Sequence, residues 1–281
     1  MKITKKKLQE IISNLKDVSF EAGEILLKYQ KRRHELRIND KGTEGIATQA
    51  DSESEEYITQ CLKEHYPSIS FLAEESCVDM ESALKLVKKN EFCWVIDPLD
   101  GTNNYVNGIP IYAISIALVQ NGTPIAGIVY NPLSGECFYA ARSIGAFFVD
   151  FRVNPLKEFH LTQKDNNKTP EECIFSPSPS YEKKNRFESQ LDTFKKNIIG
   201  ARAVRRLGSA ALELCYVANG NFDAYWEQGL KPWDTAAAWI ICKESNVKVT
   251  DFFGRAHTPF SESIIAARGS LHSTIIGKIK K

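Results

Sequence analysis

The segment 111–149 constrains the fold more than any other part of the chain. It consists of apolar stretches separated by the dipeptides Asn121-Gly122 and Ser134-Gly135. Apolar stretches that are joined by such short turns predict a meander of antiparallel β-strands. We expect the resulting sheet to form the first hydrophobic core of the protein.

On either side of this meander, the apolar residues are spaced differently. Apolar residues recur every three or four positions over 11–29, which is typical of an amphipathic helix, and a second helix is expected just after Asp51. From about residue 174 onward, strands and helices alternate as in α/β proteins. The sequence therefore predicts a mixed α/β (α+β) fold with an N-terminal half, 1–150, and a C-terminal half, 151–281.

Composition argues against several classes of function. The 36 Lys and Arg residues balance 35 Asp and Glu residues, so no overall field attracts nucleic acid or an anionic membrane. No apolar run is long enough for a membrane span or a signal peptide. The seven cysteines are widely spaced and form no zinc or redox motif. We therefore expect a cytoplasmic protein with no membrane or nucleic-acid partner, in which the cysteines pack in the core.

Two acids follow an apolar segment just before the meander. An expected strand runs directly into Asp97, Pro98 should end its pairing, and Asp100 follows three residues later. Two carboxylates and free carbonyl groups on a short turn are suitable oxygen ligands for Mg²⁺. The N–H groups at Gly101 and Thr102, where a short helix can begin, suit a phosphate. The alternative is a surface turn with a helix cap.

Acids at two other positions strengthen the first interpretation. Glu74 and Glu75 follow the apolar run 69–73, and Asp234 precedes an apolar helix expected over 235–242. Each acid has an alternative when it is taken alone, because Glu74 can be a solvated loop residue and Asp234 can be a helix N-cap. It is the combination of these acids that indicates a site.

At these residues the chain resembles the inositol monophosphatase family, within the superfamily that includes fructose-1,6-bisphosphatases and phosphoadenosine phosphatases. The similar motifs are Ala73-Glu74-Glu75-Ser76, the run from Trp94 to Pro110, and Trp233-Asp234-Thr235-Ala236-Ala237-Ala238. Further similarity lies in Ala47-Thr48-Gln49-Ala50-Asp51, Leu207-Gly208-Ser209-Ala210-Ala211 and Tyr225-Trp226-Glu227-Gln228-Gly229-Leu230. The resemblance implies a layered αβαβα sandwich with mixed and antiparallel sheets, and a homodimer.

The resemblance also implies a metal site that holds two or three Mg²⁺ ions, for which Mn²⁺ is a possible substitute. Glu74, Asp97 and the carbonyl of Leu99 would hold one ion, and Asp97, Asp100 and Asp234 a second, with a weaker third ion near Glu74. Charge supports this assignment, because four clustered carboxylates carry about −4 and would repel one another strongly without cations.

The family pattern implies roles for the remaining site residues. Asp51 and Thr102, beside the ion at Glu74, would polarise the attacking water as general-base catalysts. Phosphate oxygens would bind at Asp100, Gly101 and Thr102. The alcohol half of the substrate would contact Ser209, Ala210, Glu227 and Asp234, although Glu227 taken alone can also be a surface acid.

The sequence departs from the family pattern at a few positions. Ala238 stands where the family often has Gly, Ser245-Asn246 replaces a Gly-Gly pair, and Asn107 stands where a His is common. Asn246 can still adopt a left-handed backbone. None of these departures removes an implied metal ligand, so we expect them to affect the substrate more than the chemistry.

The implied reaction is hydrolysis of a phosphate monoester by in-line attack of water, with inhibition by Li⁺. Inositol 1-phosphate is the favoured substrate, because Asn103-Asn104-Tyr105 replaces the Lys-Glu-Phe run of phosphoadenosine phosphatases. Other sugar or nucleotide phosphates, such as fructose 1,6-bisphosphate or phosphoadenosine phosphate, stay open. A regulatory role stays open as well, since some bacterial members act with RNA polymerase factors and Arg205-Arg206 offers a basic contact.

Overall fold

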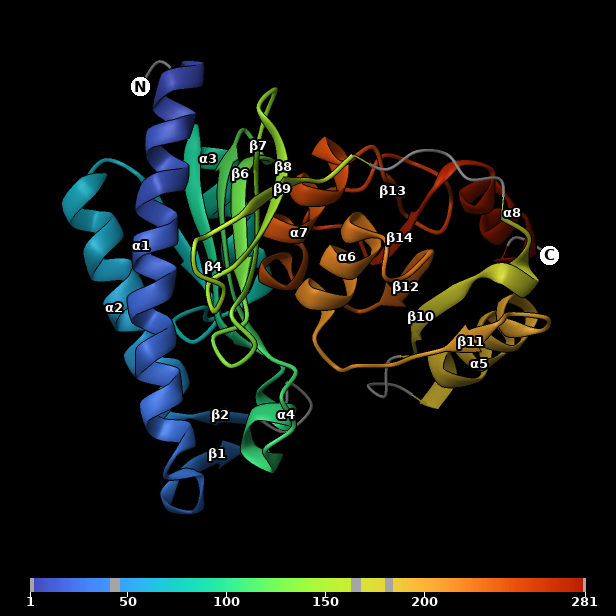
Figure 1. Cartoon of the computed structure of the whole chain (residues 1–281), viewed down its shortest axis with the longest axis horizontal. Coiled ribbons are helices and arrows are strands. Elements are labelled where there is room, and N and C mark those ends of the chain that lie inside the picture. Colours follow the sequence, from blue (N-terminus) through green and yellow to red (C-terminus); the bar gives the residue numbers. More distant parts are fainter. Residues whose placement is uncertain (1–2, 41–45, 163–167, 180–183, 280–281) are drawn as a thin grey trace.

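Five layers, helix, sheet, helix, sheet and helix, make up the computed structural model of the chain (Figure 1), which describes residues 3–40, 46–162, 168–179 and 184–279. The first layer contains α1 (Lys5–Gln30) and α2 (Gln49–His65), and the middle layer contains α6 (Ala210–Asn219) and α7 (Pro232–Glu244). The last layer contains α5 (Lys184–Ile198) and α8 (Gly269–Ile279). The predicted αβαβα sandwich is confirmed.

The larger sheet has seven strands in the order β3-β4-β5-β6-β7-β8-β9. Its strands are β3 (Ser70–Ala73), β4 (Phe92–Asp100), β5 (Ala113–Gln120), β6 (Thr123–Tyr130), β7 (Glu136–Ala141), β8 (Gly145–Asp150) and β9 (Glu158–His160). The meander predicted over 111–149 corresponds to β5–β8, and only the β3–β4 pair is parallel. Strand β9 continues the sheet beyond residue 150, while the division of the chain at that residue stays a prediction.

Strand β4 shows why the larger sheet is apolar on both faces. Trp94 and Ile96 pack in a cluster with α1 and α2, whereas Cys93 and Val95 pack in a second cluster with α6 and α7. Successive side chains of a strand point to opposite faces, so a sheet covered on both sides needs a continuous apolar run. The sequence of β4 has this character up to the point where Asp97 follows.

The smaller sheet has five strands in the order β11-β10-β12-β14-β13 and mixes parallel and antiparallel pairs. Its strands are β10 (Ile174–Ser178), β11 (Ala203–Val204), β12 (Ala224–Gln228), β13 (Lys248–Thr250) and β14 (Ser263–Ala267). Phe175, Trp226 and Ile265 of this sheet pack with Leu271 and Ile275 of α8.

The remaining elements lie around the edges of the two sheets. They are β1 (Ile38–Asp40), β2 (Ile46–Thr48), α3 (Met80–Lys89), α4 (Thr102–Asn107) and the 3₁₀ turns η1 (Arg33–Glu35) and η3 (Pro170–Glu172). Helix α2 begins at Gln49, three residues earlier than predicted, because Thr48 caps it and places Asp51 inside its first turn. None of the seven cysteines forms a disulfide bond, and five of them are buried. Among the described residues, we find no helix whose length and apolar character would allow it to cross a membrane.

Helix α7 belongs to the C-terminal half of the chain but packs directly on the larger sheet. A Cβ atom added to Gly127 of β6 would lie 2.8 Å from the Cα atom of Ala237 of α7. Only a residue without a side chain allows this approach of helix to strand.

We expect Gly127→Ala to lower the free energy of unfolding by about 1–3 kcal/mol, because overpacking forces the backbone of α7 away from the sheet. Chemical denaturation of the purified protein measures the change. Gly277→Ala is the matched control, since a Cβ there meets nothing within 4 Å, and Ala favours a helix by up to about 1 kcal/mol. Equal stability of Gly127→Ala and the parent protein would show that α7 does not depend on this close approach.

Candidate active site

Asp97 and Asp100 lie at the end of β4, on the two sides of an irregularity in the strand. Asp97 is paired with Ser115 and Asp100 with Ala113, with a shift of register between the two pairs. The prediction that Pro98 ends the pairing of the strand is wrong, because β4 continues to Asp100. Pro98 lacks an N–H group, and it falls within the bulge, where the ladder of hydrogen bonds is already interrupted.

Hydrogen bonds hold one oxygen of each aspartate in the candidate site. Asp97 Oδ1 accepts the N–H of Leu99 at 2.9 Å. Asp100 Oδ2 accepts the hydroxyl of Ser209 at 2.5 Å and the N–H of Ala211 at 2.9 Å. The second oxygen of each carboxylate takes part in none of these bonds.

Asp234 lies within the first turn of α7 rather than before the helix. Its Oδ2 accepts the N–H of Lys231, the N-cap residue, at 2.7 Å. The carboxylate therefore caps the helix, while burial and then repulsion by Asp100 and Glu74 hold its pKa well above the usual value. The two alternatives for this residue, helix cap and member of an acidic cluster, therefore do not exclude each other.

Asp51 and Thr102 come together although 51 positions separate them. Asp51 Oδ2 accepts the N–H and the hydroxyl of Thr48 at 2.8 and 2.6 Å, and this fixes the carboxylate at the start of α2. Thr102 Oγ1 lies 3.2 Å from Asp51 Oδ1 and 3.0 Å from the carbonyl oxygen of Leu99. A hydroxyl has one hydrogen, so Thr102 can donate to only one of these two oxygens at a time.

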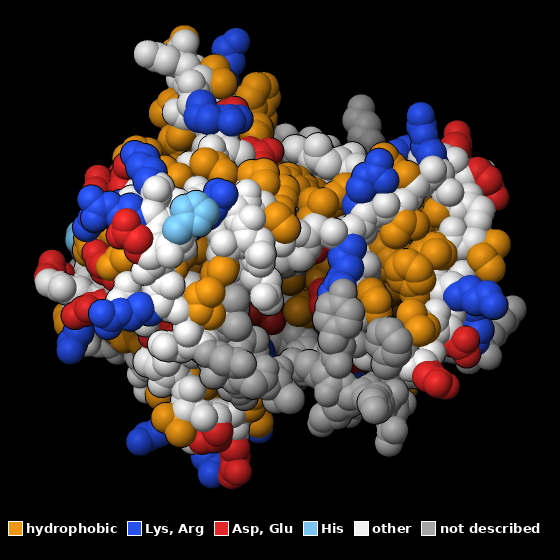
Figure 2. All heavy atoms as spheres, turned by 90° about the horizontal axis from the view of Figure 1, so that it is seen from below, with side chains coloured by type: hydrophobic (Ala, Val, Ile, Leu, Met, Phe, Trp, Pro, Cys, Tyr) orange, Lys and Arg blue, Asp and Glu red, His pale blue; other side chains and the backbone are white. Residues whose placement is uncertain are grey.

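The electrostatics of this region are those of crowded carboxylates. Burial and then repulsion by Glu74, Asp100 and Asp234 hold the pKa of Asp97 well above its usual value. Burial, opposed by the hydrogen bond from Ser209, raises the pKa of Asp100 to about 6. Negative charge at this site is therefore costly unless a cation offsets it. Figure 2 shows acidic side-chain atoms at the back of a recess in the face that carries α4.

Glu74 lies beside the end of β4, because its N–H donates to the carbonyl of Ile96 at 3.1 Å. It also borders a surface cavity. The remaining residues that line this cavity are Cys77, Val78, Asp79, Met80, Lys231 and Trp233. Glu74 is partly exposed at the mouth of the acidic site, whereas Asp97 is 1% exposed at its base.

The backbone of Gly101 makes a close approach to the C-terminal half of the chain. Gly101 has a φ of +92°, and a Cβ atom there would lie 3.2 Å from the carbonyl oxygen of Gly208. This contact and the bonds to Asp100 bring Ser209 and Ala210 next to the loop that carries Thr102. A glycine is required by both the positive φ and the lack of space.

Glu227 lies at the end of β12 and is partly buried. Burial raises its pKa to about 8, against hydrogen bonds from the hydroxyls of Tyr225 and Ser178 that lower it. Repulsion by Glu227 contributes to the raised pKa of Asp234, so the two side chains share one region. The interpretation of Glu227 as an unrelated surface acid is disfavoured.

The donor set consists of carboxylate and carbonyl oxygens, which are the ligands that Mg²⁺ prefers. Within the residues that the structure describes, no group of three or more His, Cys, Asp and Glu side chains is arranged so that it could hold a metal ion as it stands. The chemistry of the donors nevertheless fits a hard dication.

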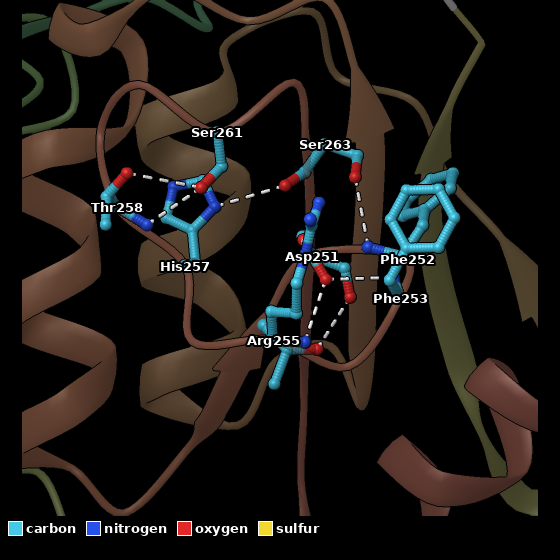
Figure 3. Close-up of polar contacts among 9 residues, drawn as sticks. Asp251, Phe252, Phe253, Arg255, His257, Thr258, Ser261 and Ser263 are labelled. Atoms are coloured by element: carbon cyan, nitrogen blue, oxygen red, sulfur yellow. Dashed lines mark hydrogen bonds and ion pairs between the residues drawn. The ribbon is translucent and has the colours of Figure 1, made fainter.

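Histidine does not contribute to this region. His257 is buried in the loop after β13, where Nδ1 pairs with the carbonyl of Ser263 at 3.1 Å (Figure 3). Burial lowers the pKa of His257, and likewise that of His272, to about 4. Both rings are therefore neutral packing residues near pH 7, whereas His34, His65 and His160 are exposed.

The departures from the family pattern lie outside the acidic site. Ala238 is fully buried among core residues of α6 and α7. Asn107 is exposed and donates to the carbonyl of Asn103 at 2.8 Å. Asn246 has a φ of +65°, which confirms the expected left-handed backbone.

The sequence analysis assigned no site role to Glu213 or Asn104, whose side chains hold the segment just before α6. Glu213 is the one acid in the apolar run 210–218, and an ionisable residue on a buried helix was the signal that could have identified it. Asn104 carries no such signal, because an Asn in a polar segment is typical of a turn.

Comparisons with known proteins agree with the fold. The model of the "Inositol monophosphatase family" matches residues 7–281. The "Nus factor SuhB" of Xylella fastidiosa is 38% identical over 83% of this chain and 78% of its own. The "Fructose-1,6-bisphosphatase/inositol-1-monophosphatase" of Thermotoga maritima is 32% identical over 84% of this chain and 82% of its own.

Among solved structures, the extragenic suppressor protein suhB of Bartonella henselae is similar, with a TM-score of 0.83 and 30% identity. The match covers 97% of this chain and 99% of that one. The layered fold and the match to the family model define a phosphatase. The chain belongs to the inositol monophosphatase family.

We expect Asp97→Asn to stabilise the protein in EDTA, with a rise in Tm of at least about 2 °C. The folded state holds the pKa of Asp97 above its unfolded value. The stability that this group contributes is therefore fully present below about pH 4 and is lost as the pH rises. Thermal unfolding from pH 4 to 8 should show a smaller decline for Asp97→Asn than for the parent protein. An equal or steeper decline would contradict the repulsion inferred at this site.

Proposed function

We propose that the protein hydrolyses a small polyol phosphate monoester in a Mg²⁺-dependent reaction, and that inositol 1-phosphate is the favoured substrate. The observation that carries this proposal is the crowding of Glu74, Asp97, Asp100 and Asp234: burial and then repulsion by the neighbouring acids raise the pKa of Asp97 and of Asp234. A phosphate dianion would be repelled by such a site unless cations reverse the local charge. The family resemblance supports the same chemistry.

Two or three Mg²⁺ ions would be held by oxygen ligands of this chain. Glu74, Asp97 and the carbonyl of Leu99 would hold one, and Asp97, Asp100 and Asp234 a second, with a third near Glu74 and with Mn²⁺ as a possible substitute. When bound, the cations supply charge neutralisation, a water of lowered pKa and stabilisation of the leaving alkoxide. The carbonyl of Leu99 keeps a lone pair for this role even when Thr102 donates to it.

Asp51 and Thr102 would act on the attacking water. The hydroxyl of Thr102 can donate to Asp51 Oδ1, and its oxygen can then accept a hydrogen bond from a water molecule. Asp51 cannot rotate freely, because Thr48 holds its other oxygen with two bonds. General-base assistance of this kind typically contributes 10²- to 10⁴-fold to a rate.

The substrate would lie between the two halves of the site. The N–H groups at Gly101 and Thr102, with Asp100 behind them, would hold phosphate oxygens. The alcohol half would contact Ser209, Ala210, Glu227 and Asp234. Carboxylates suit hydroxyl groups because they accept their hydrogen bonds, which favours a polyol over an apolar leaving group.

Other substrates are distinguishable from inositol 1-phosphate only by measurement. The Thermotoga relative is named as a fructose-1,6-bisphosphatase as well as an inositol-1-monophosphatase, and nucleotide phosphates such as phosphoadenosine phosphate fall within the same chemistry. Inhibition by Li⁺, a cytoplasmic location and a homodimeric state are further parts of the proposal that rest on the family resemblance.

A panel of phosphate monoesters, assayed with Mg²⁺ and with EDTA, tests the proposed activity. We expect phosphate release that requires Mg²⁺ and has its highest kcat/KM with inositol 1-phosphate. Asp97→Asn should lose about 10³-fold in kcat while the fold survives, because the acid shared by two cations is removed. Glu158→Gln, on the far edge strand β9, is a matched control that should keep its activity. Normal turnover of Asp97→Asn would refute the metal assignment.

A second candidate is a regulatory role in transcription, supported by the relative whose name is "Nus factor SuhB". If it applies here, the protein retains transcription factors in pull-down experiments, and Asp97→Asn retains them equally while it lacks hydrolysis. Loss of retention at Arg205→Glu, with hydrolysis unchanged, would place the contact at the exposed Arg205. Absence of any retained factor would eliminate this candidate.

A further inference from the structure

The segment 207–209, which connects β11 to α6, is not part of any sheet or helix. It runs beside the loop that carries Gly101 and Thr102, as the 3.2 Å approach of the Gly208 carbonyl to a Cβ on Gly101 demonstrates. Gly208 itself has a φ of +81°. The carbonyl of Ser209 accepts the N–H of Glu213 at the start of α6, whereas the N–H groups of Leu207 and Gly208 donate to a side chain.

Glu213 holds the segment from the side of α6. It is 1% exposed, and its Oε1 accepts the N–H of Leu207 at 3.0 Å while its Oε2 accepts the N–H of Gly208 at 3.1 Å. The hydroxyl of Ser176 on β10 donates to Oε1 as well. Both oxygens of this side chain accept from N–H groups. Only a carboxylate has two such acceptors, because the amide of a Gln would point a donor at one of the N–H groups.

Asn104 holds the same segment from the side of α4. Its Nδ2 donates to the carbonyl of Leu207 at 2.7 Å and to the carbonyl of Ile111 at 2.7 Å. An aspartate of the same shape has no hydrogen to donate and would face two carbonyl oxygens instead. In Figure 1, the connection from β11 to α6 runs toward α4, in agreement with this contact.

Burial of a carboxylate so near other acids has a cost. Burial raises the pKa of Glu213, against its three hydrogen bonds and the charge of Arg206. An apolar residue at this place would continue the apolar face of α6 without that cost. The function of the Glu213 carboxylate is therefore to fix the N–H groups of Leu207 and Gly208, the two residues just before Ser209.

We propose that Glu213 and Asn104 are positioning residues that set the alcohol-binding side of the active site through the segment 207–209. This inference rests on the proposed function, in which Ser209 and Ala210 contact the alcohol half of the substrate. Misplacement of contacts by about 1 Å can cost 10²-fold in rate. The loss of kcat/KM in a variant of Glu213 or Asn104 should therefore be larger for a substrate whose leaving group contacts Ser209 and Ala210.

The test compares Glu213→Gln and Asn104→Asp on two esters, inositol 1-phosphate and 4-nitrophenyl phosphate, whose leaving group has no polyol. We expect kcat/KM to fall about 10²-fold for the first ester and no more than about 3-fold for the second. In the double variant Glu213→Gln/Ser209→Ala, kcat/KM for inositol 1-phosphate should fall by about as much as in the more impaired of the two single variants. The two effects should not add, because both substitutions act on one segment.

Glu244→Gln is the matched control. Glu244 also accepts two N–H groups, those of Ser143 and Gly145, both at 3.1 Å, but on the hairpin between β7 and β8. Replacement of the Glu244 carboxylate should leave the ratio of the kcat/KM values for the two esters unchanged. The proposal would be overturned if Glu213→Gln and Asn104→Asp lowered kcat/KM equally for both esters. It would also be overturned if Glu244→Gln altered the ratio of the two kcat/KM values.

Amide hydrogen exchange makes the outcome independent of turnover. The N–H groups of Leu207 and Gly208 should exchange at least about 10-fold faster in Glu213→Gln than in the parent protein, with no such change in Glu244→Gln. If the parent protein hydrolyses no monoester, the proposed function fails while this measurement still decides whether Glu213 holds the segment. Unchanged exchange at both amides would refute the positioning role.

Discussion

Repulsion among carboxylates is the constraint on which the rest of the structure depends. Asp97 and Asp100 are both buried, and burial followed by repulsion from Glu74, Asp100 and Asp234 holds the pKa of Asp97 well above its usual value. The fold offsets part of this cost locally, because N–H groups at the starts of α6 and α7 donate to Asp100 and Asp234. Helix N-termini carry partial positive charge, so their convergence on the acids lowers the free energy of a site that needs a cation to be fully neutral.

The layered architecture explains how acids far apart in sequence reach one place. Helix α7 of the C-terminal half covers the larger sheet of the N-terminal half, and one core cluster contains side chains from both. Gly127 allows the backbone of α7 to approach β6 closely. Since α7 carries Asp234 in its first turn, the packing of apolar residues along the helix decides where that carboxylate points.

Several features were predictable because they depend on local rules. The turn at Asn121-Gly122, the amphipathic helix α1 and the left-handed Asn246 follow from backbone preferences and periodicity. The strand β4 was predicted to end at Pro98 and does not, because a bulge accommodates the missing N–H. Asp234 was expected before its helix, but the Lys231 N–H places it within the first turn.

The sequence by itself determined the acids, the apolar segments that deliver them and the family to which their motifs are similar. Only the tertiary structure decided which oxygen of each acid is held, and that Glu213 and Asn104 grip opposite polar groups of the segment 207–209. The physical reason is that periodicity and turn preferences act over a few residues. Hydrogen bonds across 103 positions, such as that from Asn104 to Leu207, depend on packing that no local pattern contains.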